Sequence, residues 1–242
     1  MIKTLLKSVL RHAGFEVKRR IQCDGTPLST EERRLAMIRH NGINVVLDVG
    51  ANVGQYATEL RRSGYTGKII SFEPLADAFA TLKEASRRGR NWEVFNIAIG
   101  AQDGESCINV AKNSYSSSLL PMLPKHVEHA PESRYKSTQS VTVRRLDTAL
   151  ENVVRNTDRL LLKMDTQGFE REVLRGAFCL LPQVWLVECE LSLAPLYDGQ
   201  ALFLEMVNLL HENGLKPVYF CPGFSEQTGY CLQVDGWFAK VQ

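Results

Sequence analysis

The sequence predicts an α/β fold: a doubly wound, mostly parallel sheet with helices on both faces. Short apolar runs alternate with amphipathic segments of helical period between residues 45 and 238. The strand segments are almost continuously apolar, which is typical of parallel strands buried on both faces. A chain of 242 residues suits one such domain with small additions better than two domains.

Local signals place the elements in order. Ser29 and Glu32 form a capping-box pattern ahead of a helix expected over Thr30–His40, which ends before Gly42. The alternation after this helix sets the remaining elements. We expect strands over residues 45–49, 68–72, 92–99, 160–164, 184–188, 216–220 and 230–238, and helices over 53–60, 75–88, 169–180 and 202–210.

Residues 111–140 interrupt the alternation, and we expect an irregular insertion there. A serine-rich stretch over 113–118 precedes three prolines, Pro121, Pro124 and Pro131. Long insertions of this kind are often binding loops, so a substrate lid and a flexible insertion without function both remain open. His126 and His129 within it lack a fixed third metal ligand, so surface histidines are the favoured interpretation and no metal site is predicted.

Composition and charge restrict the class of protein. Hydrophobic residues make up 44% and charged residues 23%, an ordinary globular balance. The six cysteines lack the spacing of a metal site, and we expect reduced thiols and a cytoplasmic protein. Residues 1–20 carry six basic residues and one Glu, whereas the remainder is net acidic, so nucleic-acid binding is not expected.

The basic N-terminal segment forms its own unit in the predicted organisation. Residues 1–43 are expected to be a helical extension, and residues 44–242 the main domain. Apolar residues recur at helical spacing over residues 1–12, between lysines and arginines. We favour a helix packed on the domain edge. A peripheral membrane contact through residues 1–20 stays open as the alternative.

A glycine-containing turn follows the first strand and indicates a ligand site. Asp48 ends the apolar run, and Gly50, Asn52 and Gly54 follow before the next helix. Glycines there permit a tight turn, and the helix offers free N–H groups to a ligand. The spacing differs from the G-x-G-x-x-G pattern of dinucleotide sites, and Asp48 brings a negative charge. A ligand with a cationic group fits better, and Tyr56 offers it a ring face.

Two further strand ends indicate a nucleoside. Glu73 follows the second strand near the position where an acidic side chain binds ribose hydroxyls in such folds. Asn96 and Ala98 follow at the third strand, where they would flank an adenine ring. S-adenosylmethionine combines a nucleoside with an ammonium and a sulfonium group and has no phosphate. It is therefore the favoured cofactor.

These motifs together resemble the FkbM-type methyltransferases, members of the class I S-adenosylmethionine-dependent superfamily. The resemblance rests on residues 48–56, 71–74, 145–147 and 163–177, and it spans residues 44–238. It implies a Rossmann-like, seven-stranded sheet with an antiparallel last strand, and O-methylation of sugar or polyketide hydroxyls. It also implies that the cofactor is held by Asp48, Gly50, Asn52, Gly54 and Glu73. Many members of the family have Glu where this chain has Gln167.

Acidic residues at the ends of the fourth and fifth predicted strands are candidates for catalysis. Methyl transfer to an alcohol requires alignment of the acceptor oxygen and removal of its proton. Asp165 is the first candidate for that base, or for the group that orients the acceptor, and Glu188 is the second. Lys163 points to the same side of its strand as Asp165, where it would lower a pKa. A structural ion pair of Lys163 with Glu170 or Glu188 is the alternative.

We therefore expect an S-adenosylmethionine-dependent O-methyltransferase that acts on a saccharide or small-molecule hydroxyl, held partly by residues 113–135. One alternative is a nicotinamide-dependent oxidoreductase, against which Asn52 and Asp48 count. Another is a non-catalytic nucleoside-binding domain that docks a membrane or a partner through residues 1–20.

Overall fold

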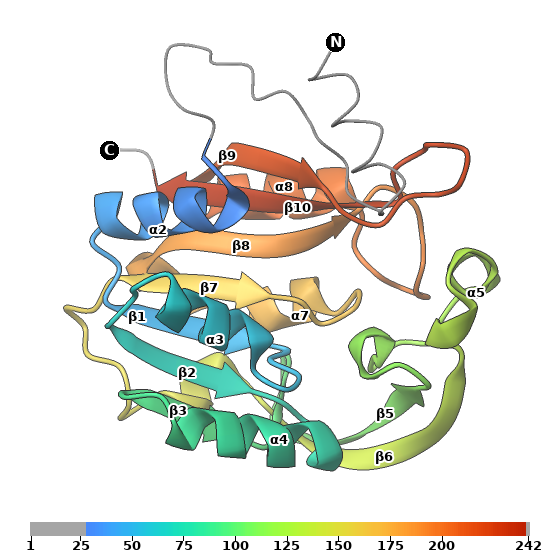
Figure 1. Cartoon of the computed structure of the whole chain (residues 1–242), viewed down its shortest axis with the longest axis horizontal. Helices are drawn as coiled ribbons and strands as arrows, with labels where there is room; N and C mark the ends of the chain where they lie inside the picture. The colour runs from blue at the N-terminus through green and yellow to red at the C-terminus, as the bar shows by residue number, and fades with distance from the viewer. Residues whose placement is uncertain (1–27, 241–242) are drawn as a thin grey trace, which may run out of the picture.

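The computed structural model describes residues 28–240, which form the predicted α/β architecture (Figure 1). The main sheet of this region has seven strands in the order β3-β2-β1-β7-β8-β10-β9. Their bounds are Val45–Val49 (β1), Lys68–Phe72 (β2), Trp92–Phe95 (β3), Leu160–Met164 (β7), Val184–Ser192 (β8), Leu215–Pro222 (β9) and Gln233–Lys240 (β10).

Strand direction confirms a mostly parallel sheet with an antiparallel last strand. β1 pairs in parallel with β2 and β7, β2 with β3, and β7 with β8. β10 runs antiparallel to both β8 and β9. The carboxyl ends of β1, β2, β7 and β8 therefore meet at one edge, where ligands bind in open α/β sheets.

Helices cover both faces of this sheet (Figure 1). In Figure 1, the near face carries α2 (Thr30–His40), α3 (Gln55–Arg62) and α4 (Ala76–Arg87), and α7 (Glu170–Arg175) and α8 (Phe203–Glu212) lie behind the strands. The core follows the same division. Leu162, Val187 and Phe238 belong to one fully buried cluster, while Val46, Leu161 and Leu186 belong to another.

The predicted boundaries are confirmed where strong local signals exist. The helix over Thr30–His40 is present as predicted, and Ser29 and Glu32 make both hydrogen bonds of the capping box. The helix predicted from residue 53 begins instead at Gln55, because Gly54 takes a left-handed φ of 87° at its N-cap. The strand predicted over 92–99 divides into β3 and β4 (Ala98–Ile99), which belong to different sheets.

The prediction of an irregular insertion is wrong for part of residues 111–140. A second sheet, β4-β6-β5, is built from β5 (Gly104–Ala111) and β6 (Tyr135–Arg144), neither of which was predicted as a strand. α5 (Pro124–His129) and short 3-10 turns connect these two strands. Many side chains of β5 and β6 are exposed and polar, which explains why their apolar pattern is weak. We call residues 112–134 the excursion.

The helix predicted over residues 1–12, and the alternative of a membrane contact through residues 1–20, lie outside the described residues. Between residues 28 and 240, none of the helices has the length and apolarity needed to cross a bilayer.

Candidate active site

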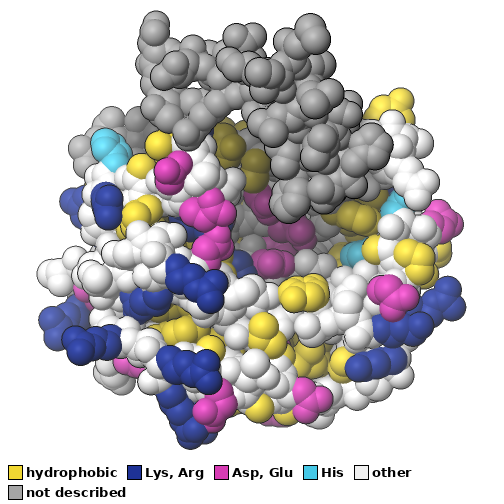
Figure 2. All heavy atoms as spheres, in the orientation of Figure 1, with side chains coloured by type: hydrophobic (Ala, Val, Ile, Leu, Met, Phe, Trp, Pro, Cys, Tyr) yellow, Lys and Arg dark blue, Asp and Glu magenta, His cyan; other side chains and the backbone are white. Residues whose placement is uncertain are grey.

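A cavity of about 410 Å³ opens at the carboxyl ends of β1, β2 and β7. Its wall joins segments that are far apart in the sequence: the turn after β1, the end of β2, the loop after β7, and the excursion. Figure 2 shows acidic side chains gathered near the centre of the face on which α2 and α3 lie. The cavity is lined among others by Gly50, Asn52, Tyr56, Glu73, Ala98, Ser114, Lys163, Asp165, Gln167 and Glu190.

The turn after β1 is shaped by close backbone approach. Gly50 has a φ of 76°, and a Cβ there would lie 2.0 Å from the carbonyl oxygen of Asp165. Gly54 also has a positive φ, and a Cβ there would lie 2.9 Å from Leu82. Asn52 takes a left-handed φ of 48° between them. The two glycines therefore let this turn pack against the loop after β7 and against α4.

Glu73 is fixed at the end of β2 by two backbone donors. Its Oε2 accepts the N–H of Asn52 at 2.8 Å, and its Oε1 accepts the N–H of Leu75 at 2.8 Å. Asn96 supports the same turn, because its Nδ2 donates to the carbonyls of Glu73 and Pro74. Burial raises the pKa of Glu73 to about 7, although both backbone hydrogen bonds favour the carboxylate.

Asp48 lies behind the cavity wall. It is fully buried, it accepts a hydrogen bond from the Ser71 hydroxyl at 3.1 Å, and it forms an ion pair with Lys163 at 3.2 Å. Lys163 lines the cavity and also donates to the carbonyl oxygen of Gly50 at 3.1 Å. Burial alone would lower the pKa of Lys163, but Asp48 and Asp165 together raise it. Asp48 thus acts on the cavity through Lys163 and the Gly50 backbone.

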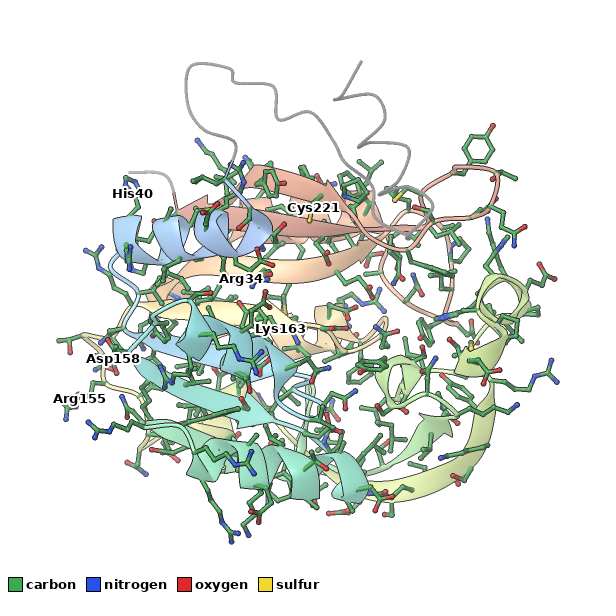
Figure 3. All side chains as sticks on the ribbon, in the orientation of Figure 1. Arg34, His40, Arg155, Asp158, Lys163 and Cys221 are labelled. Atoms are coloured by element: carbon green, nitrogen blue, oxygen red, sulfur yellow. The ribbon has the colours of Figure 1, made fainter. Side chains whose placement is uncertain are left out.

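Glu188 is committed to a buried network. The Arg34 guanidinium donates to both of its carboxylate oxygens, at distances down to 2.7 Å, and the Tyr56 hydroxyl donates at 2.6 Å. Arg34 and Lys163 lie over the ring of Tyr56, at 4.7 and 5.4 Å from its centroid. Figure 3 shows the Arg34 and Lys163 side chains in the region between α2, α3 and the strands. Glu188 holds α2 and α3 against β8 and does not line the cavity.

The loop after β7 brings Asp165 to the cavity. The Asp165 side chain is 47% exposed and lies 3.7 Å from the ammonium of Lys163. The side-chain amide of Gln167 donates to Asp165 at 2.9 Å and to Glu190 at 3.2 Å. Glu170, in the first turn of α7, accepts the backbone N–H groups of Thr166 and Gly168 and thereby fixes the loop.

The excursion forms the outer wall of the cavity. Ser114, Tyr115 and Leu119 line it, and the side-chain amide of Asn52 donates to the Ser114 hydroxyl at 3.1 Å. The hydroxyl of the buried Ser118 donates to the carbonyl oxygen of Gln167 at 2.7 Å. Tyr115 is 63% exposed, and its ring is available to a ligand that enters from solvent.

The structure therefore brings together most of the site residues that the sequence suggested. Gly50, Asn52, Tyr56, Glu73, Ala98, Lys163 and Asp165 line one cavity, while Asp48, Gly54, Asn96 and Glu188 support its wall from behind. The ion pair that the sequence allowed for Lys163 exists, but its partners are Asp48 and Asp165 rather than Glu170 or Glu188. Sequence analysis did not select Gln167 and Glu190 as site residues; Glu190 follows the same apolar run as Glu188 at period two.

The histidines of the excursion differ from the expectation of surface residues. His126 is 4% exposed and packs between Tyr197 and Phe224, with ring centroids at 5.1 and 5.7 Å. Its Nδ1 has no hydrogen-bond partner among the described residues, and burial lowers its pKa to about 4. His129 is partly exposed and lies 3.6 Å from Glu226. Within residues 28–240, no three metal-binding side chains are grouped to hold an ion.

The burial of His126 predicts an acid-sensitive excursion. The imidazole is neutral in both states above its unfolded pKa of about 6.5, and below that value the unfolded chain takes up a proton that the folded chain excludes until about pH 4. Stability should therefore fall as the pH drops from about 6.5 towards 4. His126→Phe should lose less stability than the natural chain between pH 7 and pH 5 in urea titrations. Equal losses would remove His126 as a cause.

The acceptors and apolar side chains around the cavity fit a cationic nucleoside. A carboxylate at a strand end suits ribose hydroxyls, and the apolar side chains of Leu75, Ala98 and Ile99 suit a base. The Oδ1 atom of Asn52 is buried without a partner among the described residues, so a donor on a ligand has an acceptor waiting. The acidic groups of the wall favour positive charge over pyrophosphate.

Comparisons with known proteins agree with this chemistry. The family model described as the methyltransferase FkbM domain matches residues 48–217. A 2-O-methyltransferase, NoeI, of Sinorhizobium fredii is 27% identical over 173 residues, which cover 69% of this chain and 70% of that protein. Methyltransferase 1 of Beauveria bassiana is 26% identical over 149 residues, which cover 54% of this chain and 57% of that protein.

Among solved structures, magnesium protoporphyrin IX methyltransferase of Synechocystis PCC 6803, with bound S-adenosylmethionine, aligns over 99% of this chain and 97% of its own. The alignment has 11% sequence identity and a TM-score of 0.49. The assignment of the fold rests on the strand order and directions described above.

Proposed function

Because the chain belongs to the FkbM methyltransferase family, we propose that it methylates a hydroxyl oxygen of a saccharide or of a small, polyketide-like molecule. The methyl donor of this enzyme is S-adenosylmethionine. Family membership does not favour the alternatives of a nicotinamide-dependent oxidoreductase or of a non-catalytic domain. One observation carries the proposal. A single cavity is lined by Glu73, which suits the ribose of a nucleoside, and by a second carboxylate, Asp165, next to the excursion.

The cofactor would occupy the wall between the ends of β1 and β2. Glu73 accepts the ribose hydroxyls, and its two backbone hydrogen bonds already hold the carboxylate in place. Tyr56 and Gly50 line the same wall, and Asp48 holds the Lys163 ammonium beside them. When bound, the cofactor supplies an electrophilic methyl group.

Asp165 would remove the proton of the acceptor hydroxyl. Its side chain is about half exposed on the cavity wall and has solvent to which it passes the proton on. The ammonium of Lys163 lies 3.7 Å from this carboxylate. The residues of the excursion that line the cavity hold the acceptor in line with the methyl group, which is mainly a proximity effect. Glu188, the second sequence candidate, is tied to Arg34 and Tyr56, which leaves Asp165 as the proposed base.

Isothermal titration with S-adenosylhomocysteine, with NAD as comparison, tests the cofactor assignment. We expect binding of the homocysteine compound alone. Glu73→Ala should weaken it by about 1–3 kcal/mol, the scale of a lost charged hydrogen bond. Asp48→Ala should weaken it by a similar amount, through the release of Lys163. Binding of NAD instead, or the same affinity in both variants, would contradict the site.

The pKa of Glu73 predicts pH-dependent cofactor affinity. Ribose hydroxyls donate to the ionised form, so binding should strengthen as the pH rises through about 7 and then level off. Below that pH, binding should release a proton, which titrations in buffers of different ionisation enthalpy detect. Glu73→Gln should bind more weakly and remove this pH dependence. A dependence that persists in Glu73→Gln would assign it to another group.

A further inference from the structure

Gln167 occupies an unusual position at the acceptor side of the cavity. It takes a left-handed φ of 56° in the loop after β7, ahead of Gly168. Its carbonyl oxygen is held by Ser118 of the excursion. The backbone is therefore fixed on both sides, and the side-chain amide is aimed at the cavity wall.

The amide of Gln167 is fully engaged, and its partners set its orientation. Its Nε2 donates to Asp165 Oδ1 at 2.9 Å and to Glu190 Oε2 at 3.2 Å, while its Oε1 accepts the hydroxyl of Tyr197 at 2.8 Å. The reverse orientation would place an acceptor oxygen against two carboxyl groups. One nitrogen thus connects two acidic side chains, one from the loop after β7 and one from β8.

Glu190 lies in an environment that disfavours its charge. Burial and the carboxyl groups of Asp165, Glu170 and Asp235 raise its pKa well above the ordinary value. Asp235 lies opposite it in the β8–β10 register, and the Tyr197 hydroxyl donates to the same Gln167 amide that contacts Glu190. Gln233 donates to its Oε2 at 2.6 Å, which opposes the shift. Lys163, which lines the same cavity, forms its ion pairs with Asp48 and Asp165.

We propose that Gln167 joins Asp165 and Glu190 into one carboxyl pair with divided roles: Asp165 accepts the hydroxyl proton, and Glu190, as a carboxylic acid, donates a hydrogen bond to the acceptor. This proposal rests on the proposed function. In the transfer, the oxygen–methyl bond forms as the sulfur–methyl bond breaks, and the hydroxyl proton moves to Asp165 and then to solvent. Gln167 is a positioning residue, since it acts through the two carboxyl groups.

The pair also explains what an amide does here that a carboxylate does not. An ionised Glu at position 167 has no proton to donate, so it would repel the Asp165 carboxylate and take up the hydrogen bond that Glu190 offers to the acceptor. The Gln side chain instead satisfies one oxygen of each and adds no charge. Acceptors with a second oxygen beside the methylated hydroxyl would contact both members of the pair.

Carboxyl NMR titration tests the pair without an acceptor. The full chain is labelled with ¹³C and ¹⁵N and saturated with S-adenosylhomocysteine, and the Asp165 and Glu190 carboxyls are assigned through bonds. We expect Glu190 to titrate above its ordinary range. Asp165→Asn should shift the Glu190 midpoint to lower pH, and Gln167→Glu should shift it to higher pH. The exposed control Glu151→Gln should leave both midpoints unchanged.

Two results would overturn the pair: a Glu190 midpoint in the ordinary range, or the same midpoint in the natural chain and in Asp165→Asn. Gln167→Leu, which removes the amide without adding a charge, should also move the Glu190 midpoint to higher pH, and a merely structural Gln167 would leave it in place. The natural chain alone decides the first point, so the test stands even where a variant does not fold. Failure of the proposed function appears separately, as failure of the sample to bind S-adenosylhomocysteine.

Discussion

Replacement of Asp165 by Asn should lower turnover by about 10²–10⁴-fold, the usual contribution of a general base. Asn keeps the size of the side chain and an oxygen that accepts from Gln167, so the loop after β7 should keep its shape. Only the ability to take a proton is lost. The affinity for S-adenosylhomocysteine should change little, because Asp165 faces the acceptor side.

The measurement is the rate of S-adenosylhomocysteine formation with a panel of glycosides and small alcohols, together with calorimetric affinity. Asp77→Asn is the matched control, since Asp77 is an exposed carboxylate in the first turn of α4. Equal turnover in Asp165→Asn and the natural chain would show that another group takes the proton. An equal loss in Asp77→Asn would show that the assay reports stability instead.

Arg34→Met should destabilise the fold by about 3–5 kcal/mol, because removal of one partner leaves a buried charge uncompensated. Arg34 is 8% exposed, and Glu188, its partner on β8, is equally enclosed. The Tyr56 hydroxyl would remain as the only side-chain donor that Glu188 has among the described residues. Urea unfolding monitored by circular dichroism gives the change in free energy.

A double-mutant cycle separates the interaction energy of Arg34 and Glu188 from the contribution of each residue alone. Arg34→Met with Glu188→Gln should recover part of the stability lost in Arg34→Met, because the unpaired charge is removed. Glu59→Gln is the control: Glu59 lies 3.4 Å from the same guanidinium but its side chain is 40% exposed, so it should cost less than about 1 kcal/mol. Additive losses in the double variant would mean that the contact between Arg34 and Glu188 contributes little.

The sequence predicted the main sheet well because its strands are buried on both faces. Val45–Val49 and Leu160–Met164 are buried throughout and apolar except for one charged residue each, Asp48 and Lys163, and both strands appear with the predicted bounds. β5 and β6 were missed because most of their side chains face solvent or alternate weakly, so their backbone pairing and not their pattern defines them. Single-chain periodicity reports burial, and it carries little information on strands that are half exposed.

The candidate site was likewise predicted only in part. Glu73 and the glycine turn were predictable, because their position at strand ends follows from the order of elements. The roles of Gln167 and Glu190 follow from tertiary contacts that the sequence pattern does not show. Gln167 takes a left-handed backbone conformation after β7, and β8 continues beyond its predicted end at residue 188. Asp48 was expected to contact the ligand, yet it is buried and pairs with Lys163 instead. The spacing of residues in a sequence does not show how deeply a side chain lies below the cavity surface.

The excursion should not be replaceable alone by the corresponding segment of another enzyme. It is tied to the rest of the molecule by the hydrogen bond from Ser118 to Gln167 and by the backbone β-bridge between Met122 and Tyr197. A segment grafted from another enzyme would arrive without partners in the loop after β7 and in the loop before α8. New acceptor preferences should therefore be engineered, or inherited in evolution, by moving three stretches together: residues 112–134, 165–168 and 194–200. Chimeras that carry only the first should fold around the main sheet and still misplace the acceptor.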